Sequence, residues 1–344
     1  MPARDFGAMC SALVLTRTTK KLALELEIDP SDHTNREQWW KWLAYGLFSR
    51  RARACSTLET LVISGLGRLT GADVRVFTSV LASQHPEETL CGTSRGVMGE
   101  KDATLMCGAR IRWNFDEGVQ SNFLTLDTPI EFVRIFSDDD TSDWVNILIA
   151  GFGRCQVRRR DLEFHDEPPA IRGSGGITSL TLGFPESDNV ATLTLSSLIK
   201  AIGPSLRTLV LDGPKKVYSR EFNENEIIQS CPNLLELTLA RDIIEVQLDF
   251  RKYRATNTPI PELTAPWFDV LKLADYLSAP ENPLTKCARR LKFCVKYITS
   301  LRSNFCMSID KDENCSLDHT GKSPRDPNIN KTNDLNQVYT ANRK

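Results

Sequence analysis

The stretches ITSLTL at residues 177–182, LRTLVL at residues 206–211 and LLELTL at residues 234–239 repeat one pattern of apolar side chains. Each has apolar residues at its first, fourth and sixth positions, and they begin 29 and 28 residues apart. A fourth copy, LETLVI, lies at residues 58–63. Between the later copies, apolar residues recur at helical spacing, as in the segment 195–202. The chain therefore contains an internal repeat.

Alternation within each copy predicts a strand with one buried face. Leu209 and Leu211 point to one side of such a strand, whereas Val210 and Asp212 point to the other. A helix of about ten residues then returns the chain, and the next strand stacks in parallel on the first. A single unit cannot bury its own apolar face, but stacked neighbours can.

These residues resemble the leucine-rich-repeat family, particularly its cytosolic type with helices on the convex side and a period near ~28. Cys231-Pro232-Asn233-Leu234 also looks like the turn that precedes a strand in repeats of F-box-associated proteins. The resemblance covers residues 177–241 and implies a solenoid with a concave strand face. The family's Asn or Cys, three residues past the last core leucine, is missing from all four copies, where Leu66, Pro185, Pro214 and Asp242 stand.

Segments on both sides of the repeat extend the predicted strand stack. Residues 22–28 alternate as a strand, and a capping-box pattern, Asn35 followed by Gln38, predicts the start of a helix that contains Phe48. Only nine residues separate Leu239 from Leu248, too few for a helical return, so a hairpin or an irregular repeat is expected there. The remaining predicted elements are helices within 74–81 and 270–277 and strands at 246–250 and 291–295.

The long gap between the copies at 58–63 and 177–182 predicts an insertion at residues 89–172. Short β-type runs punctuated by Gly and Asp clusters are typical of a small barrel or sandwich; they lie at 111–113, 123–126, 132–136, 144–149 and 154–157. The stretch from Phe132 to Phe164 resembles the second half of a Src-homology-three barrel. That family binds proline-rich peptides through a Trp and a Pro-x-x-Tyr motif. Here residues 157–162 carry neither Pro nor Tyr.

The predicted fold class is thus α/β, a leucine-rich-repeat solenoid with a parallel strand stack, interrupted by a small all-β barrel-like insertion. Residues 1–88 and 173–302 form the two parts of the solenoid, and residues 89–172 form the insertion. From about Ser303 the composition becomes rich in Asn, Asp, Lys, Ser and Pro. Such a segment buries too little apolar surface to offset its ordering entropy, so 303–344 is expected to be a disordered tail.

Composition places the chain among ordinary globular proteins, with 41% apolar and 25% charged residues and a net charge of −1. This near-neutral balance gives no basic footprint for nucleic acid. No apolar stretch reaches the ~18 residues of a membrane span, and the short apolar patch near the N-terminus does not fit a signal peptide. Ten cysteines without a CxxC pair then favour reduced thiols and a cytoplasmic location, with the nucleus as an alternative.

Motifs for cofactors, metals or catalysis are weak. Gly321-Lys322-Ser323 has Ser316 where a phosphate-binding loop needs its first glycine, and the calcium-like Asp310-x-Asp312-x-Asn314 continues with Cys315 instead of glycine. The four histidines lie far apart, without metal-ligand spacing. We therefore predict no enzyme, no cofactor and no metal.

The sequence predicts a non-catalytic scaffold that binds another protein on the outward positions of its strands. Alternatives are a substrate-recruiting adaptor of a ubiquitin ligase, from the family resemblance alone, and a small-molecule enzyme in the β insertion. Neither nucleic acid nor membrane is an expected partner. The predicted binding residues are Glu59, Thr60, Thr178, Thr181, Arg207, Thr208, Asp212, Glu236 and Thr238.

Overall fold

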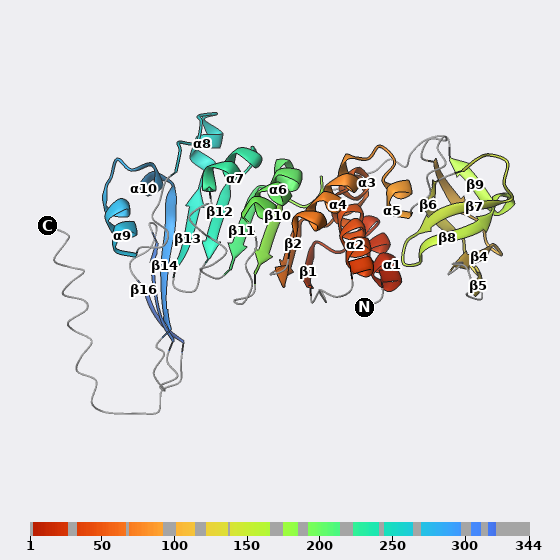
Figure 1. Ribbon diagram of the computed structural model, residues 1–344, viewed down its shortest axis with the longest axis horizontal. Coiled ribbons are helices and arrows are strands. Elements are labelled where there is room, and N and C mark those ends of the chain that lie inside the picture. Colours follow the sequence, from red (N-terminus) through yellow and green to blue (C-terminus); the bar gives the residue numbers. More distant parts are fainter. Residues whose placement is uncertain are drawn as a thin grey trace, which may run out of the picture.

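A computed structural model of the chain is a mixed α/β structure with two sheets, one at each end of an elongated molecule (Figure 1). It describes residues 3–26, 33–66, 69–91, 101–113, 122–136, 138–165, 175–184, 192–213, 223–240, 244–263, 270–296, 304–310 and 316–320. Among these residues, no helix combines the length and the hydropathy that a membrane crossing would require.

The nine-stranded sheet begins with five parallel strands in the order β1-β2-β10-β11-β12. The four predicted motifs supply the last four of these strands. Their equivalent leucines lie side by side, because Leu61 pairs with Leu180, Leu180 with Leu209, and Leu209 with Leu237. The strand bounds are β1 Lys21–Glu25, β2 Thr60–Ser64, β10 Ser179–Gly183, β11 Thr208–Asp212 and β12 Glu236–Ala240.

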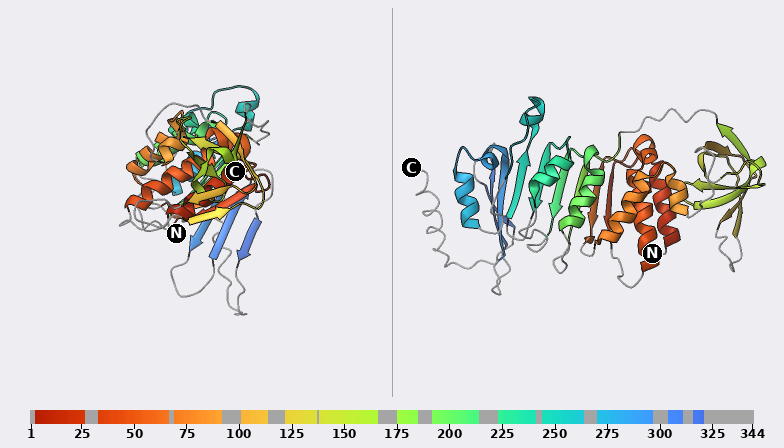
Figure 2. Two further views of the ribbon diagram at one scale, coloured as in Figure 1. Left: turned by 90° about the vertical axis from the view of Figure 1, so that its right-hand side faces the viewer. Right: turned by 45° about the horizontal axis from the view of Figure 1, so that its top comes forward.

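Helices cover one side of these strands (Figure 2). Each packs on the next along the sheet, α2 on α4, α4 on α6 and α6 on α7, and their apolar faces share one core with the strand leucines. Helix α2 already begins at His33, so Asn35 lies inside it and the predicted capping box does not start it. The bounds are α2 His33–Leu43 with a π-helical continuation η1 Ala44–Phe48, α4 Gly71–Ala82, α6 Thr192–Ile202 and α7 Glu224–Ser230.

Beyond β12 the sheet becomes antiparallel. Strand β13, Ile244–Asp249, pairs antiparallel with β12, which confirms the predicted departure from a helical return. Strand β14, Ala288–Lys296, follows the short helices α8 Arg251–Ala255, α9 Val270–Ser278 and α10 Pro283–Cys287. The segment 303–344, expected to be disordered, contributes two further strands, β15 Asn304–Asp310 and β16 Ser316–Thr320. Beyond residue 320 that expectation, and the phosphate-loop motif, lie outside the described residues.

The seven-stranded sheet lies within the predicted insertion and is antiparallel throughout, in the order β5-β4-β8-β7-β6-β3-β9. Its order has two ends, β5 and β9, so the predicted barrel is not closed. The sequence did not predict β3 and β9. The strand bounds are β3 Lys101–Leu105, β4 Arg110–Trp113, β5 Asn122–Thr125, β6 Ile130–Phe136, β7 Trp144–Ile149, β8 Gly153–Arg158 and β9 Leu162–His165.

Three helices join the two sheets: α1 Ala3–Val14, α3 Arg50–Cys55 and α5 Pro86–Cys91. Helix α1 packs against both η1 and β8. Phe136 and Leu148 of the seven-stranded sheet belong to the larger core, whereas that sheet's other face encloses a core of its own. The insertion therefore docks on the N-terminal helices through one part of its outer face.

Candidate functional site

The outward side chains of the parallel strands form the candidate site, which we call the polar strand face. It comprises the side chains at alternate positions of β1, β2, β10, β11 and β12, on the side of the sheet opposite the buried leucines. All of these residues are partly or well exposed. Register aligns them in three rows across the sheet: Lys21, Thr60, Ser179, Thr208 and Glu236; Ala23, Val62, Thr181, Val210 and Thr238; and Glu25, Ser64, Gly183, Asp212 and Ala240.

A repeated hydrogen-bond pattern fixes where each strand begins. The Thr178 carbonyl accepts the amides of Arg207 at 2.7 Å and Thr208 at 3.0 Å. The Arg207 carbonyl accepts the next pair in the same way, from Leu235 at 2.7 Å and Glu236 at 3.0 Å. Lys20 and Glu59 repeat the arrangement on the preceding strands. Because the same contact recurs at each step, the outward side chains are held in one register from β1 to β12.

Ion pairs close the face at the β12 end. Arg251 of α8 contacts both Glu236 and Asp249, the latter at 3.1 Å. Arg289 of β14 lies 3.6 Å from the same Glu236 carboxylate. All of these side chains are partly or well exposed, so these contacts contribute little to stability. They do bring two guanidinium groups to one end of the face.

Six of the nine predicted binding residues lie on this face within the strands: Thr60, Thr181, Thr208, Asp212, Glu236 and Thr238. The other three, Glu59, Thr178 and Arg207, lie one residue before their strands. The carbonyl of each of these residues accepts two successive amides at the start of the next strand of the sheet. Arg251 and Arg289 were not among the predicted binding residues. The sequence alone could not identify them because they reach Glu236 through antiparallel pairing outside the repeat.

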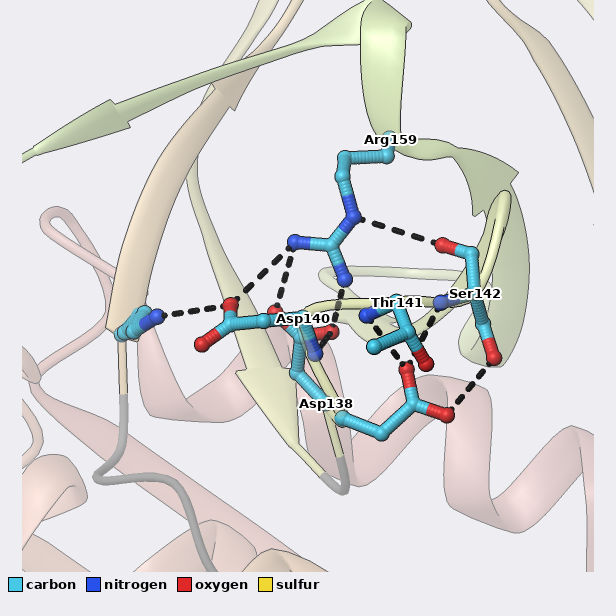
Figure 3. Close-up of polar contacts among 7 residues, drawn as sticks. Asp138, Asp140, Thr141, Ser142 and Arg159 are labelled. Carbon is cyan, nitrogen blue, oxygen red and sulfur yellow. Dashed lines mark hydrogen bonds and ion pairs between the residues drawn. The ribbon is translucent and has the colours of Figure 1, made fainter.

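An acidic loop between β6 and β7 is a second polar cluster (Figure 3). Arg159 contacts Asp138 and lies 3.4 Å from Asp140, which also pairs with Lys101 at 3.2 Å. Hydrogen bonds from Ser142 and Thr141 lower the pKa of Asp139 below its usual range. The carboxylates of Asp138, Asp139 and Asp140 therefore all have partners within this sheet and its loops. The described residues contain no group of three His, Cys, Asp or Glu side chains arranged to hold a metal ion.

A buried polar network lies where the seven-stranded sheet packs on the N-terminal helices. Arg51 lies 2.6 Å from Asp102, and Asp102 lies 3.3 Å from Arg134. Arg134 in turn lies 3.3 Å from Glu87, which accepts the Tyr45 hydroxyl at 3.0 Å. Burial and the Glu87 carboxylate raise the pKa of Tyr45, so its hydroxyl keeps its proton.

A small cavity adjoins this network, lined in part by Ser11, Tyr45, Arg51 and Arg134. Its volume is about 10 Å³, which is the space of a single water molecule. A small-molecule substrate does not fit in it. The network pairs polar side chains of β3 and β6 with those of α3, α5 and η1.

The cysteine thiols are a further set of titratable groups. Seven cysteines are free thiols: Cys10, Cys55, Cys91, Cys107, Cys155, Cys231 and Cys287. Burial raises the pKa of Cys91, Cys155 and Cys231 to about 12, so these thiols stay protonated and unreactive at neutral pH.

Comparison with protein-family models, with curated proteins and with solved structures finds no match to this chain.

Proposed function

We propose that the chain is a non-catalytic scaffold that binds another protein on the polar strand face. The observation that carries this proposal is the alignment of outward side chains in three rows across five parallel strands. A partner meets these side chains as one preorganised surface, so little conformational entropy is lost when it binds.

We further propose that the units from β2 to β12 are leucine-rich repeats stacked as a solenoid. Support comes from the fully buried leucines at equivalent positions, such as Leu180, Leu209 and Leu237. It also comes from the recurring carbonyl contact before each strand and from the helices on the side away from the polar strand face. Each unit buries its apolar residues against the next, as repeat proteins do.

The composition of the face suits a polar protein surface. Its middle row alternates Val62 and Val210 with Thr181 and Thr238, which offer methyl groups and hydroxyls side by side. Acidic residues lie at its margins, as Glu25 and Asp212 do, and Arg251 and Arg289 lie at one end. Mixed hydroxyl, apolar and charged groups of this kind are typical of a non-obligate protein interface.

Affinity purification from native cell extracts tests the proposal. The wild-type chain is compared with a Thr181→Arg, Thr238→Arg double variant, which adds two large cations to the middle row. The matched control is Gln229→Arg, an exposed position on α7. We expect the proteins that co-purify with the wild type to be lost from the double variant and kept by the control.

Two results would contradict the scaffold. One is an unchanged set of co-purifying proteins with the double variant, whose circular dichroism must match that of the wild type. The other is an equal loss with Gln229→Arg, which would point to the helical side.

A further inference from the structure

The free edge of the seven-stranded sheet at β5 is a second surface with its own chemistry. Strand β5 ends the strand order and pairs only with β4 among the described strands. Two large apolar side chains are exposed on it, Phe123 at 47% and Leu124 at 37%. An uncovered edge with exposed apolar side chains on both faces is a template for pairing with another chain.

The hydrogen-bond pattern shows which β5 amides are available at that edge. The Leu126 amide donates to the Ala109 carbonyl at 3.0 Å, so residue 126 is bonded toward the β4 side. Bonded residues alternate along an antiparallel strand, which directs the amide of Leu124 to β4 as well. The amides and carbonyls of Phe123 and Thr125 therefore point away from β4, toward the open edge.

The surface beside this edge is basic. Among the described residues, the outward strand positions of β4, β5 and β8 hold Arg110, Arg112, Arg154 and Arg158 and no carboxylate. The Arg110 guanidinium carbon lies 4.7 Å from the centroid of the Phe123 ring, so this side chain reaches from β4 over β5 at the free edge. Arg158 of β8 also stacks on a ring, 5.5 Å from the centroid of Trp144 on β7, which lies on the side away from the free edge. A guanidinium stacked on a ring keeps its N–H edge directed outward and suited to a carboxylate.

We propose that the β5 edge binds an acidic, extended segment of a partner protein, which adds to the sheet as an eighth strand. Backbone hydrogen bonds to Phe123 and Thr125 hold the segment, and its alternate side chains fall on opposite faces. Acidic side chains lie on the face that carries Arg110. Apolar side chains lie on the other face, beside Leu124.

Two other occupants fit the surface less well. A second copy of the chain paired through β5 would bring two Arg110 guanidinium groups to one interface, which is unfavourable because like charges repel. A single-stranded nucleic acid would stack its bases on the aromatic rings. Here Phe123 and Trp144 each carry a guanidinium, which a base would have to displace.

Binding of a defined peptide tests the proposal with the full chain. The probe is a fluorescein-labelled nonapeptide of alternating Glu and Val, measured by fluorescence anisotropy, with a Lys–Val peptide of equal length as control. We expect saturable binding of the Glu–Val peptide that weakens with added salt, and no binding of the Lys–Val peptide.

Two substitutions separate the charge from the strand edge. Arg110→Glu reverses the charge over Phe123, and Thr125→Pro removes an outward amide without breaking a bond to β4. Each substitution should raise the Kd of the Glu–Val peptide by at least about tenfold. The control Arg160→Glu makes the same charge change at a side chain that is 75% exposed in the turn between β8 and β9, and this variant should bind the peptide as the wild type does.

Several outcomes would overturn the inference. They are absence of binding by the Glu–Val peptide, equal binding of the Lys–Val peptide, or wild-type affinity in Arg110→Glu. Wild-type affinity in a folded Thr125→Pro would exclude strand addition. Concentration-dependent dimerisation abolished by Thr125→Pro would assign the edge to a second copy. Tighter binding of a labelled oligothymidylate, lost in Arg110→Glu, would assign it to nucleic acid.

Discussion

Two buried regions, the interior of the parallel strands and the junction between the seven-stranded sheet and the N-terminal helices, are held together by different means. In strands β2, β10, β11 and β12 each interior leucine packs beside its equivalent on the next strand. In the junction, by contrast, each polar group has a particular partner on another element, as Asp102 of β3 has Arg51 of α3. Repeated apolar contacts are interchangeable, whereas a buried charge that loses its partner is not compensated. The junction should therefore be the more sensitive region for a single substitution.

The largest effect is expected from Asp102→Ala, which leaves the buried Arg51 and Arg134 guanidinium groups without this carboxylate. We expect a loss of about 3–5 kcal/mol in the free energy of unfolding, measured by urea denaturation. The control Asp161→Ala removes a looser pair with Arg160 at 3.8 Å and should cost less than about 1 kcal/mol. Equal losses of unfolding free energy in the two variants would show that the buried charges of the junction are no more sensitive than an exposed pair.

Leu209→Ala tests the repeat. Leu209 is fully buried between Leu180 and Leu237, and its truncation should cost about 2–5 kcal/mol, toward the low end if the neighbouring leucines relax into the space. Val210→Ala, one residue along on the polar strand face, is the control and should cost less than about 1.5 kcal/mol. If Val210→Ala lost as much unfolding free energy as Leu209→Ala, the polar strand face would have to be covered by other residues.

Asp73→Asn examines a buried charge pair in the helical layer, where Asp73 of α4 accepts from Arg36 of α2 at 2.8 Å. Burial acts to raise the pKa of Asp73, but hydrogen bonds from Arg36 and Thr70 outweigh it and lower this pKa. A lowered folded-state pKa stabilises the protein above the unfolded value of about 3.9, and this contribution is lost as the pH falls through the folded value. The substitution should cost about 2 kcal/mol at pH 7.

Urea denaturation at several pH values checks this result. The difference between Asp73→Asn and the wild type should shrink below about pH 4, where the wild-type carboxyl begins to lose its advantage. A difference that stays constant down to pH 3 would mean that the carboxylate charge does not matter.

The smallest effect is expected from Arg251→Ala on the polar strand face. Arg251 contacts Glu236 and Asp249, but its side chain is 51% exposed. Because solvent screens such pairs, the free energy of unfolding should fall by less than about 1 kcal/mol, as measured by thermal and urea denaturation. A larger loss of unfolding free energy would show that these ion pairs hold α8 on the sheet. It would also bring the effect of Arg251→Ala closer to that of Asp102→Ala.

The predictability of each region follows from how far apart its contacts lie in the sequence. The strands β2, β10, β11 and β12 could be predicted because alternation and leucine spacing are local. Strand β3 could not, since its buried Asp102 looks like a surface residue until Arg51 and Arg134 are beside it. Helix α1 is predictable from its own periodicity, because Phe6, Cys10 and Val14 are buried and four residues apart, as on one helix face.

The candidate site shows the same division. Outward positions such as Thr181 and Thr238 followed from strand alternation alone. The ion pairs of Glu236 required the antiparallel pairing of β13 and β14, which brings Arg289 across from another part of the chain. The β5 edge likewise depends on which strands pair, because an edge is defined by the neighbour that a strand lacks.

The sequence by itself determined the repeat, the inward and outward sides of its strands, and the β-rich character of the insertion. These are properties of side-chain periodicity, which each segment carries within itself. Only the tertiary structure decided that the insertion is an open seven-stranded sheet and that Arg51, Asp102, Arg134 and Glu87 share one buried network. The physical reason is that apolar burial is non-directional and leaves a periodic pattern, whereas a charge pair joins two particular residues at any sequence separation.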